Sequence, residues 1–360
     1  MNTTLTAPSA TTVAIDLAKD VFELAYVDAD GRIVARQRLG RSAFAKVFDN
    51  RAPLRIVMEA CGSAHYWGRR FRRLGHGVEL LPAHDVRPYV HRTKTDRADA
   101  AGLWEAARCA AIRPVPVKTV EQQGIQGLHR AREFHKAQRT AAINLLRGLL
   151  REFGVVIPAG AAKVRPAVLA ALEDAENELP MALRETLLAV LDTIATAQRA
   201  MAAIETRLQE YLDRDLRSQR LLRAGGVGVL TATALSASVG EFERFPSARH
   251  FASCLGLTPR EHSSGSRRRL GRVTKRGDVY LRTLLIHGAR AVLRSAKVAH
   301  GKSRPLDRTQ AWALALAARI GHNKAAVALA NKTARRLWAA EHHRTSFDPD
   351  HVSAMPATAH

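Results

Sequence analysis

The spacing of apolar residues over residues 183–211 constrains the fold more than any other feature of the sequence. Spacings of four and three alternate there without a break, through Leu183, Leu187, Val190, Ile194, Ala197, Met201, Ile204, Leu208 and Tyr211. About four heptads of such positions predict a long helix with an apolar seam, which is typical of a coiled coil. One helix packed on its own domain has the same pattern. An antiparallel hairpin with a helix expected at residues 121–153 agrees with either.

The part of the chain before residue 118 has the pattern of an α/β domain. Short apolar runs and turn residues predict three strands over residues 12–39. Helices and strands then alternate: a helix at 42–48, a strand ending at Glu59, a helix stopped by Gly75, a further strand and a helix over 96–109. This order predicts a mixed sheet with helices packed on it.

Four carboxylates stand at informative places in this α/β part. Asp16 lies inside the apolar strand VAIDLA, where an unpaired charge is costly to bury, and Glu59 ends a neighbouring strand. Asp96 and Asp99 are three residues apart, so a helix places both on one face. Oxygen ligands from several elements suit a two-metal phosphoryl-transfer site with Mg²⁺ or Mn²⁺, and the lack of Cys/His clusters argues against zinc. Taken singly, the acids have structural alternatives, namely a turn cap, an ion pair of Glu59 with Arg55, and a helix N-cap at Asp96.

The charge balance indicates the partner. The chain has 56 Lys and Arg against 33 Asp and Glu, a formal net charge of +23, which favours nucleic acid. Its cysteines, Cys61, Cys109 and Cys254, are widely spaced and form neither a disulfide framework nor a zinc pattern, as expected in a reducing cytoplasm. The sequence shows no signal peptide and no window of 18 uninterrupted apolar residues, so we expect a cytoplasmic protein with no membrane span.

A basic segment over residues 256–278 combines serines with arginines. It contains one glutamate and seven basic residues, which are Arg260, Arg267, Arg268, Arg269, Arg272, Lys275 and Arg276. Arginines bind phosphates and stabilise the transition state of phosphoryl transfer, and an activated serine hydroxyl attacks a phosphodiester. His262 is near enough in sequence to act as a base. The alternative is a solvated basic loop whose serines are merely flexible linkers.

The rest of the C-terminal part is predicted to be helical. Residues 221–240 indicate two helices joined by a glycine-rich turn, whose backbone N–H groups suit phosphate contact. A tight structural turn has the same sequence. Further helices are expected at 247–254, 279–296 and 309–343, followed by a frayed tail after Thr345.

Four segments together resemble a known family. They are TVAIDLAKD with Asp16, IVMEACG with Glu59, KTDRADA with Asp96 and Asp99, and GLTP…HSSG…GRVTKRGDVYLRTLLIHGA. In order and spacing these are similar to the DEDD transposases of bacterial insertion elements, the insertion sequence 110 family, which also includes the Piv-type DNA invertases. Residues 117–158 resemble the branch typified by insertion sequence 1111. The resemblance runs from about residue 12 to residue 341.

The resemblance implies a fold and a mechanism. It implies an RNase H-like, RuvC-type N-terminal domain, a helical coiled-coil connector and a mainly helical C-terminal transposase domain. It also implies that Asp16, Glu59, Asp96 and Asp99 bind Mg²⁺ and that a C-terminal serine is the nucleophile. The serine of the family precedes a glycine, which matches Ser264, with Ser263 directly before it. A guide RNA from the non-coding end of the element, which pairs with target and donor DNA, is a further implication.

The sequence thus predicts a transposase that acts as a site-specific DNA recombinase. We expect domains at residues 1–118, 119–218 and 219–342, and a disordered tail at 343–360. The expected partners are double-stranded DNA of the element ends and target, a guide RNA, and further copies of the chain joined through the coiled coil as a dimer or tetramer. The alternatives are a RuvC-like structure-selective nuclease that uses water, and a non-catalytic DNA- or RNA-binding protein on the same fold.

Overall fold

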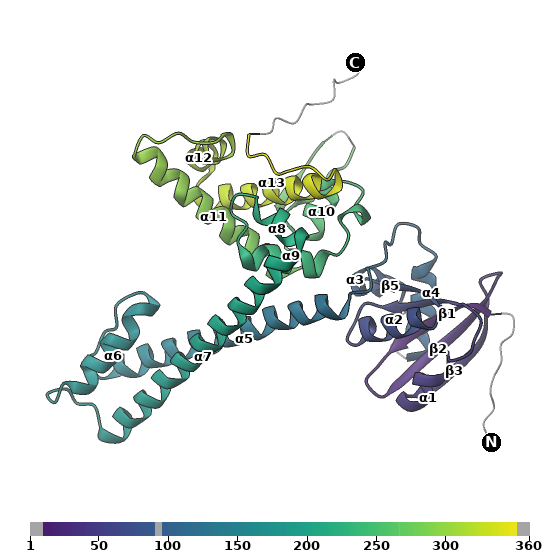
Figure 1. Cartoon of the computed structure of the whole chain (residues 1–360), viewed down its shortest axis with the longest axis horizontal. Helices are drawn as coiled ribbons and strands as arrows, with labels where there is room; N and C mark the ends of the chain where they lie inside the picture. The colour runs from purple at the N-terminus through teal and green to yellow at the C-terminus, as the bar shows by residue number, and fades with distance from the viewer. Residues whose placement is uncertain (1–9, 91–95, 266, 351–360) are drawn as a thin grey trace, which may run out of the picture. The chain divides into compact units, whose positions relative to one another are not determined.

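The computed structural model describes residues 10–90, 96–265 and 267–350, without the side chains of residues 96–98 (Figure 1). The chain forms two compact units, Met1–Glu121 and Gln122–His360. The first unit is a mixed α/β domain and the second is mostly helical, as the sequence predicts. Each unit is described by itself below. The finer division into three domains and a tail stays a prediction.

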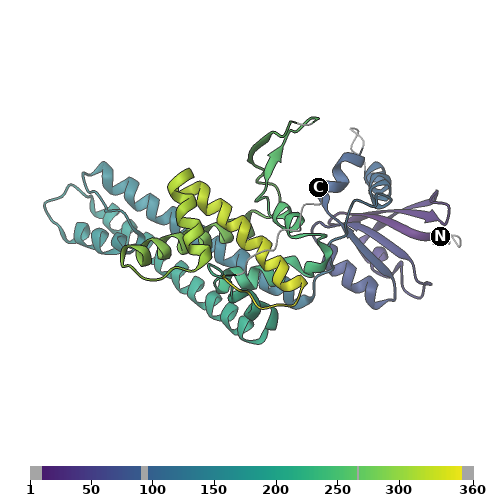
Figure 2. The ribbon, with the colours of Figure 1, turned by 90° about the horizontal axis from the view of Figure 1, so that it is seen from above.

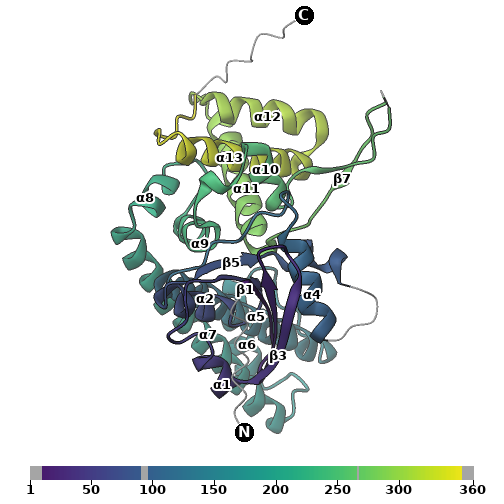
Figure 3. The ribbon, with the colours of Figure 1, turned by 90° about the vertical axis from the view of Figure 1, so that its right-hand side faces the viewer.

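One five-stranded sheet forms the centre of the first unit (Figure 3). Its strands are β1 (Ala10–Leu17), β2 (Val21–Asp28), β3 (Ile33–Gly40), β4 (Arg55–Glu59) and β5 (Gly77–Leu81). The order across the sheet is β3-β2-β1-β4-β5. Strands β1, β2 and β3 pair antiparallel, whereas β4 pairs parallel with both β1 and β5. Parallel neighbours require a crossover helix, and the helix before β5 provides the one between β4 and β5.

Aromatic side chains fill one face of this sheet, which is covered by α1 (Arg41–Lys46) and α2 (Ala64–Arg73). Phe22 of β2 stacks on Phe44 of α1 with ring centroids 4.0 Å apart, and Trp67 of α2 meets both rings edge-on. Such aromatic contacts add to the stability that burial alone provides. This face is therefore a packed core.

Smaller side chains line the other face of the sheet, which is covered by α3 (Ala83–Val86) and α4 (Asp96–Ala107). A short 3₁₀ turn, η1 (Arg87–Tyr89), follows α3. Ala14 and Val57 of the sheet pack against Leu103 and Trp104 of α4. The small residues let α4 approach β1 closely, and this is the face to which strand alternation directs Asp16 and Glu59.

Three helices form the connector of the second unit: α5 (Val120–Glu152), α6 (Val164–Glu173) and α7 (Met181–Arg214), with a short 3₁₀ turn, η2 (Ala161–Lys163), before α6. Figures 1 and 2 show them as one elongated group of helices. The predicted seam of α7 is buried within the chain: Leu187 and Ile194 pack with Leu146 and Leu150 of α5. The seam thus makes the intramolecular hairpin, and a coiled coil between protomers stays a prediction.

Helix α7 is long and apolar enough to cross a membrane by length and composition alone, the one such helix among the described residues. The mean hydropathy of its most apolar window is 1.4. A single helix of this kind is weak evidence for a span, because a core helix of a soluble protein meets the same criterion. The seam residues of this helix, among them Leu187 and Ile194, pack on α5 and α6.

The C-terminal helices enclose the second core. They are α8 (Leu216–Leu222), α9 (Val229–Val239), α10 (Ala248–Cys254), α11 (Val279–Gly301), α12 (Arg308–Ile320) and α13 (His322–His342), with the 3₁₀ turn η3 (Phe242–Arg244). Their buried side chains, among them Phe251, Leu285 and Trp338, form the largest apolar cluster of the described chain. The helices agree with the segments predicted from the sequence.

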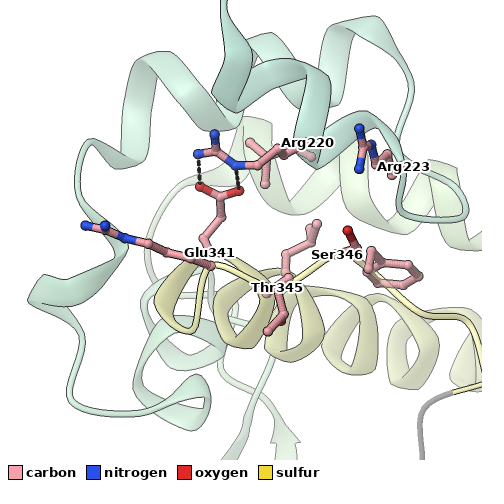
Figure 4. Close-up of a pocket in the computed structure, with 10 residues that line it drawn as sticks. Arg220, Arg223, Glu341, Thr345 and Ser346 are labelled. Atoms are coloured by element: carbon pink, nitrogen blue, oxygen red, sulfur yellow. Dashed lines mark hydrogen bonds and ion pairs between the residues drawn. The ribbon is translucent and has the colours of Figure 1, made fainter.

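A buried carboxylate joins α8 to α13. Glu341 accepts two hydrogen bonds from Arg220, at 2.9 and 2.8 Å, at the wall of a cavity of about 70 Å³ (Figure 4). Arg217 lies 3.8 Å from the same carboxylate. The bidentate geometry compensates for burying Glu341, whose side chain is 7% exposed.

The chain after α13 packs back onto the helices for some residues. Thr309 Oγ1 donates a hydrogen bond to the carbonyl of Pro349, and the backbone N–H of Arg308 donates to Asp350. Arg336 lies over the ring of Phe347. These contacts hold residues 347–350 on α12 and α13. Residues 351–360 lie outside the described range, and the expected tail stays a prediction.

Candidate active site

Asp16 and Glu59 occupy neighbouring positions near the ends of two adjacent parallel strands. The parallel ladder of β1 and β4 pairs Ile15 with Met58, and the two acids are the next residue on each strand. Side chains alternate along a strand, so Asp16 points to the same face as Ala14, and Glu59 to the same face as Val57. That is the face covered by α4. The sequence prediction that these two acids converge thus agrees with the register.

Asp99 comes to this face from α4. One of its carboxylate oxygens, Oδ1, is buried and has no hydrogen-bond partner among the described residues. Its neighbours on the helix, Ala100 and Leu103, pack against the sheet. An ionised oxygen without a partner is costly to bury, so a cation bound there would stabilise it. The structure places Asp96 at the first residue of α4, but its side chain lies outside the described residues.

The pKa of the Cys61 thiol reflects the negative charge at this edge of the sheet. Burial raises its pKa to about 11, and the carboxylates of Glu59 and Asp16 add to the rise. Both acids therefore lie close enough to the same sulfur to act on it electrostatically. Cys61 directly follows the strand that carries Glu59, which makes its surroundings part of the same edge.

A divalent cation fits this acidic edge by its donor chemistry. Carboxylate oxygens are the ligands of Mg²⁺ and Mn²⁺, and the unpartnered oxygen of Asp99 is such a donor. The described side chains, which leave out Asp96, contain no assembled group of three or more His, Cys, Asp or Glu. Strand register and packing place Asp16, Glu59 and Asp99 on the α4 face, and Asp96 is the first residue of α4. That the four acids bind a metal together stays a prediction.

Two neighbouring residues refine this picture. Arg55 donates two hydrogen bonds to Glu79, at 2.9 and 2.8 Å. The sequence suggested Glu59 as the ion-pair partner of Arg55, whereas the structure pairs Arg55 with Glu79. Glu23 stands opposite Asp16 in the antiparallel ladder and opposite Arg38 on β3. Sequence reasoning missed Glu23 because only the strand register brings it beside Asp16.

The basic segment is a β-hairpin, where the sequence suggested a loop. Strands β6 (Pro259–Glu261) and β7 (Leu270–Val273) pair antiparallel, and a bridge between Ser264 and Arg267 extends the pairing to the tip. Figure 3 shows the hairpin projecting away from the helices of its unit. Polar residues hid the strands from the sequence pattern, because a ribbon exposed on both faces has no apolar alternation.

The hairpin separates the two serines onto opposite faces. Ser263 donates a hydrogen bond to Glu261 (2.8 Å) and accepts one from the backbone of Arg269 (3.0 Å). Alternation along the strand places Ser264 on the other face, together with His262 and Arg267. The hydroxyl of Ser264 makes no hydrogen bond with any described residue. All seven predicted basic residues of the segment are exposed.

The face that carries Ser263 turns toward its own helices. Glu261 and Arg268 line a cavity of about 420 Å³ together with Arg249 of α10 and Arg335 of α13. Glu261 lies 3.5 Å from Arg268 and reduces the positive charge there. On the Ser264 face, the described residues of the hairpin include no acid.

The base of the hairpin is held tightly. Arg282 is buried and donates to the carbonyls of Leu255 (3.1 Å) and Arg276 (3.2 Å), which belong to the two legs. A Cβ atom added at Gly277, whose φ is +87°, would lie 1.8 Å from the carbonyl oxygen of Cys254. The legs thus cross so closely that only glycine fits at residue 277.

Comparisons with known proteins cover both halves of this arrangement. A family model described as a transposase and named for the DEDD transposases of IS110 matches residues 13–155, and the model of the IS116/IS110/IS902 transposase family matches residues 218–304. A probable family 20 transposase of Pseudomonas aeruginosa is 42% identical over 94% of this chain and 98% of its own length. The chain belongs to the IS110 transposase family.

Other members of the family are similar over comparable lengths. The transposase for insertion sequence element IS1111A of Coxiella burnetii is 38% identical over 91% of this chain and 88% of its own. The transposase for IS1328 of Yersinia enterocolitica is 32% identical over 94% and 99%. The first family model spans the acidic edge of this transposase and the second spans its serine hairpin, so both halves belong to the family pattern.

The glycine-rich turn of this transposase has a packing role. A Cβ atom on Gly288 of α11 would lie 1.9 Å from the carbonyl oxygen of Gly226, so the turn and α11 touch backbone to backbone. The sequence suggested that this turn presents N–H groups to phosphate. Close packing alone accounts for the glycine at residue 226, and phosphate contact by the rest of the turn stays a prediction.

Proposed function

We propose that this transposase cuts and rejoins DNA with the Ser264 hydroxyl as nucleophile and with Mg²⁺ held by Asp16, Glu59, Asp96 and Asp99. The buried, unpartnered oxygen of Asp99 on the face shared with Asp16 and Glu59 is the observation that carries the metal half. The separation of the two serines carries the other half, because Ser263 is engaged with Glu261 while Ser264 faces an open basic surface.

The proposed chemistry is a transesterification at phosphorus. The Ser264 oxygen forms a bond to the phosphorus of a DNA phosphodiester as the bond to the 3′ oxygen breaks. The serine proton passes to a base, for which His262 on the same face is placed, and a proton ends on the released 3′ oxygen. The products are a phosphoserine link and a free 3′-OH. In the reverse step, the 3′-OH of another strand attacks the phosphoserine, which rejoins the DNA and releases the serine. Mg²⁺ supplies charge stabilisation at the phosphate and the leaving oxygen.

Basic side chains hold the DNA in this proposal. Arg267 and Arg269 share the Ser264 face, and guanidinium groups bind phosphate oxygens in pairs. The remaining basic residues of the hairpin, Arg260, Arg268, Arg272, Lys275 and Arg276, add sequence-independent attraction. The net charge of +23 supports a polyanionic partner.

The finer architecture belongs to the same proposal. The strand order β3-β2-β1-β4-β5, with β2 antiparallel to its neighbours, supports an RNase H-like, RuvC-type domain with the acids at its edge. Strand exchange between two duplexes needs several active sites, so the protein acts as a dimer or tetramer, joined through its connector. A guide RNA of the element directs it to DNA; this part rests on the family resemblance. It works in the cytoplasm, on the nucleoid.

Trapping a covalent protein–DNA adduct on supercoiled DNA that carries the element ends tests the proposal. Wild type and Ser263→Ala should form the adduct, and Ser264→Ala should form none and cut no DNA. Peptide mapping should place the phosphate on residue 264. Continued cutting by Ser264→Ala would instead indicate a RuvC-like nuclease that uses water, and DNA binding without cutting by the wild type under any Mg²⁺ concentration would indicate a binding protein.

A further inference from the structure

A buried histidine joins the connector to the start of α11. His129 of α5 is 3% exposed. Its Nδ1 lies 2.9 Å from the hydroxyl of Tyr280, and its Nε2 lies 3.1 Å from Oγ1 of Thr233. The three residues come from α5, α11 and α9, and 151 residues separate His129 from Tyr280 in the sequence.

The direction of each proton in this chain of hydrogen bonds follows from the geometry. Thr233 donates its hydroxyl proton to the carbonyl of Val229 at 2.7 Å, so its oxygen is left to accept from His129 Nε2–H. Burial, together with the nearby charge of Arg132, lowers the pKa of His129 to about 4, so the ring is neutral at pH 7. Nδ1 is then an acceptor, and the Tyr280 hydroxyl donates to it.

Tyr280 keeps the proton that this bond requires. Burial raises the pKa of its phenol to about 12, and the nearby carboxylate of Glu133 acts in the same direction. The charged groups that act on the network are Arg132 and Glu133 on α5, Asp278 at the N-cap of α11 and Glu205 on α7. The neutral network therefore holds one fixed arrangement of donors and acceptors.

The network connects the helix that follows the metal-bearing unit with the start of α11. The metal-bearing unit ends at Glu121, and α5 carries the chain from there to His129, about two helical turns later. Tyr280 is the second residue of α11, and Arg282, two residues on, holds both legs of the serine hairpin. One hydrogen bond thus links the helix that leads from the metal site to the base of the hairpin that carries Ser264.

Other contacts fix the same stretch of α5 without reaching the hairpin. Gln126 donates to Ser238 of α9 at 2.9 Å, and Arg132 pairs with Glu205 of α7 at 2.6 Å. Beside them lies a cavity of about 290 Å³ lined by His129, Arg130 and Tyr280. Among these polar contacts, the bond to Tyr280 is the one that reaches α11.

We propose that His129 and Tyr280 are positioning residues that set the direction in which α5 leaves the C-terminal unit relative to the base of the serine hairpin. This inference rests on the proposed function, because positioning matters only if Ser264 and the acids act together. Because α5 is the helix that follows the metal-bearing unit in the chain, this bond fixes the first turns of that helix against α11, whether the acids serve the serine of the same protomer or that of a partner.

Tyr280→Phe is the sharpest test because it removes one oxygen and keeps the ring. We expect adduct formation on supercoiled DNA to fall tenfold or more while DNA affinity changes less than twofold. Hydrogen exchange should rise in residues 125–133 and 279–283 and stay unchanged in the first unit. Tyr26→Phe is the matched control: it removes the phenol bond to Gln37 on the aromatic-core side of the sheet and should leave adduct formation unchanged.

A double variant separates positioning from stability. His129→Leu combined with Tyr280→Phe leaves no unpaired ring nitrogen, so it should recover much of the thermal stability lost in Tyr280→Phe. Adduct formation should stay low even so. Recovery of adduct formation together with stability, or full activity and unchanged exchange in Tyr280→Phe, would overturn the inference. A different result, DNA cutting by Ser264→Ala, would contradict the proposed function itself.

Discussion

At the scale of the residue, two carboxylates with buried oxygens differ in their partners, and this difference supports the proposed metal site. Asp99 has a buried oxygen without a partner among the described residues, whereas Glu341, also buried, accepts a bidentate pair of hydrogen bonds from Arg220. A paired carboxylate belongs to structure and needs no further ligand. An unpaired carboxylate destabilises the folded protein, and binding of a cation there would offset this destabilisation.

Asp99→Asn should therefore separate stability from activity. Without divalent metal we expect the variant to be at least as stable as the wild type, because an amide costs less to bury than a carboxylate. Mg²⁺ at about a hundred times its dissociation constant should stabilise the wild type by about 2.7 kcal/mol and the variant much less. Thermal melts with and without Mg²⁺ measure this, and equal Mg²⁺ shifts in both proteins would remove Asp99 from the metal site.

His129 should make the C-terminal unit acid-sensitive. Its pKa is about 4 in the folded protein against 6.5 as the ordinary value, so the unfolded chain binds the proton first as pH falls. Its contribution is complete above pH 6.5 and is lost as pH falls toward 4. Between pH 7 and pH 5 the wild type should lose about 2 kcal/mol more than His129→Leu in urea unfolding. A pH dependence that is equal in the two proteins would contradict the assignment.

At the scale of the element, close backbone contacts decide how the serine hairpin is mounted. Gly277 and Arg282 hold the two legs together, and Asn331 of α13 donates to the carbonyl of Leu257 in one leg. The hairpin itself is exposed on both faces, so its orientation comes from its base. Helix α11 starts directly after this base and carries the link to α5.

Gly277→Ala should loosen that base. The added Cβ meets backbone at 1.8 Å, and φ is +87°, so both overlap and strain oppose it. We expect a loss of about 3 kcal/mol or more in unfolding free energy. Gly154→Ala shares a positive φ, +76°, but has nothing within 4 Å, so it should cost about 1 kcal/mol. Denaturant unfolding of both variants compares the two, and equal losses would show that strain alone accounts for residue 277.

At the scale of the whole molecule, excess positive charge and its local arrangement act together. The net charge of +23 favours attraction of DNA from any direction, whereas we expect the arginines of the Ser264 face to make a local contact with it. Glu261 offsets Arg268 on the opposite face of the hairpin. The two kinds of contribution predict different salt dependences.

Arg269→Gln should weaken DNA binding more than Arg268→Gln does. Loss of one phosphate contact lowers the slope of log affinity against log salt by about 1, and we expect this for residue 269. Arg268→Gln removes a charge already paired with Glu261 and should change the slope by less. Titrations of a DNA duplex at several salt concentrations measure both slopes. Equal slopes in the two variants would mean that the faces do not differ in DNA contact.

The sequence by itself determined the local elements and the residue types of the site. Strand and helix periods, glycine stops and the run around Asp16 are short-range signals, since backbone hydrogen bonding and side-chain direction repeat every few residues. Only the tertiary structure decided that Asp16, Glu59 and Asp99 share the α4 face, that Glu23 stands beside Asp16 and that the serines lie on opposite faces. The link between His129 and Tyr280 joins residues 151 apart, and no local pattern encodes such a pair because packing alone brings the two rings together.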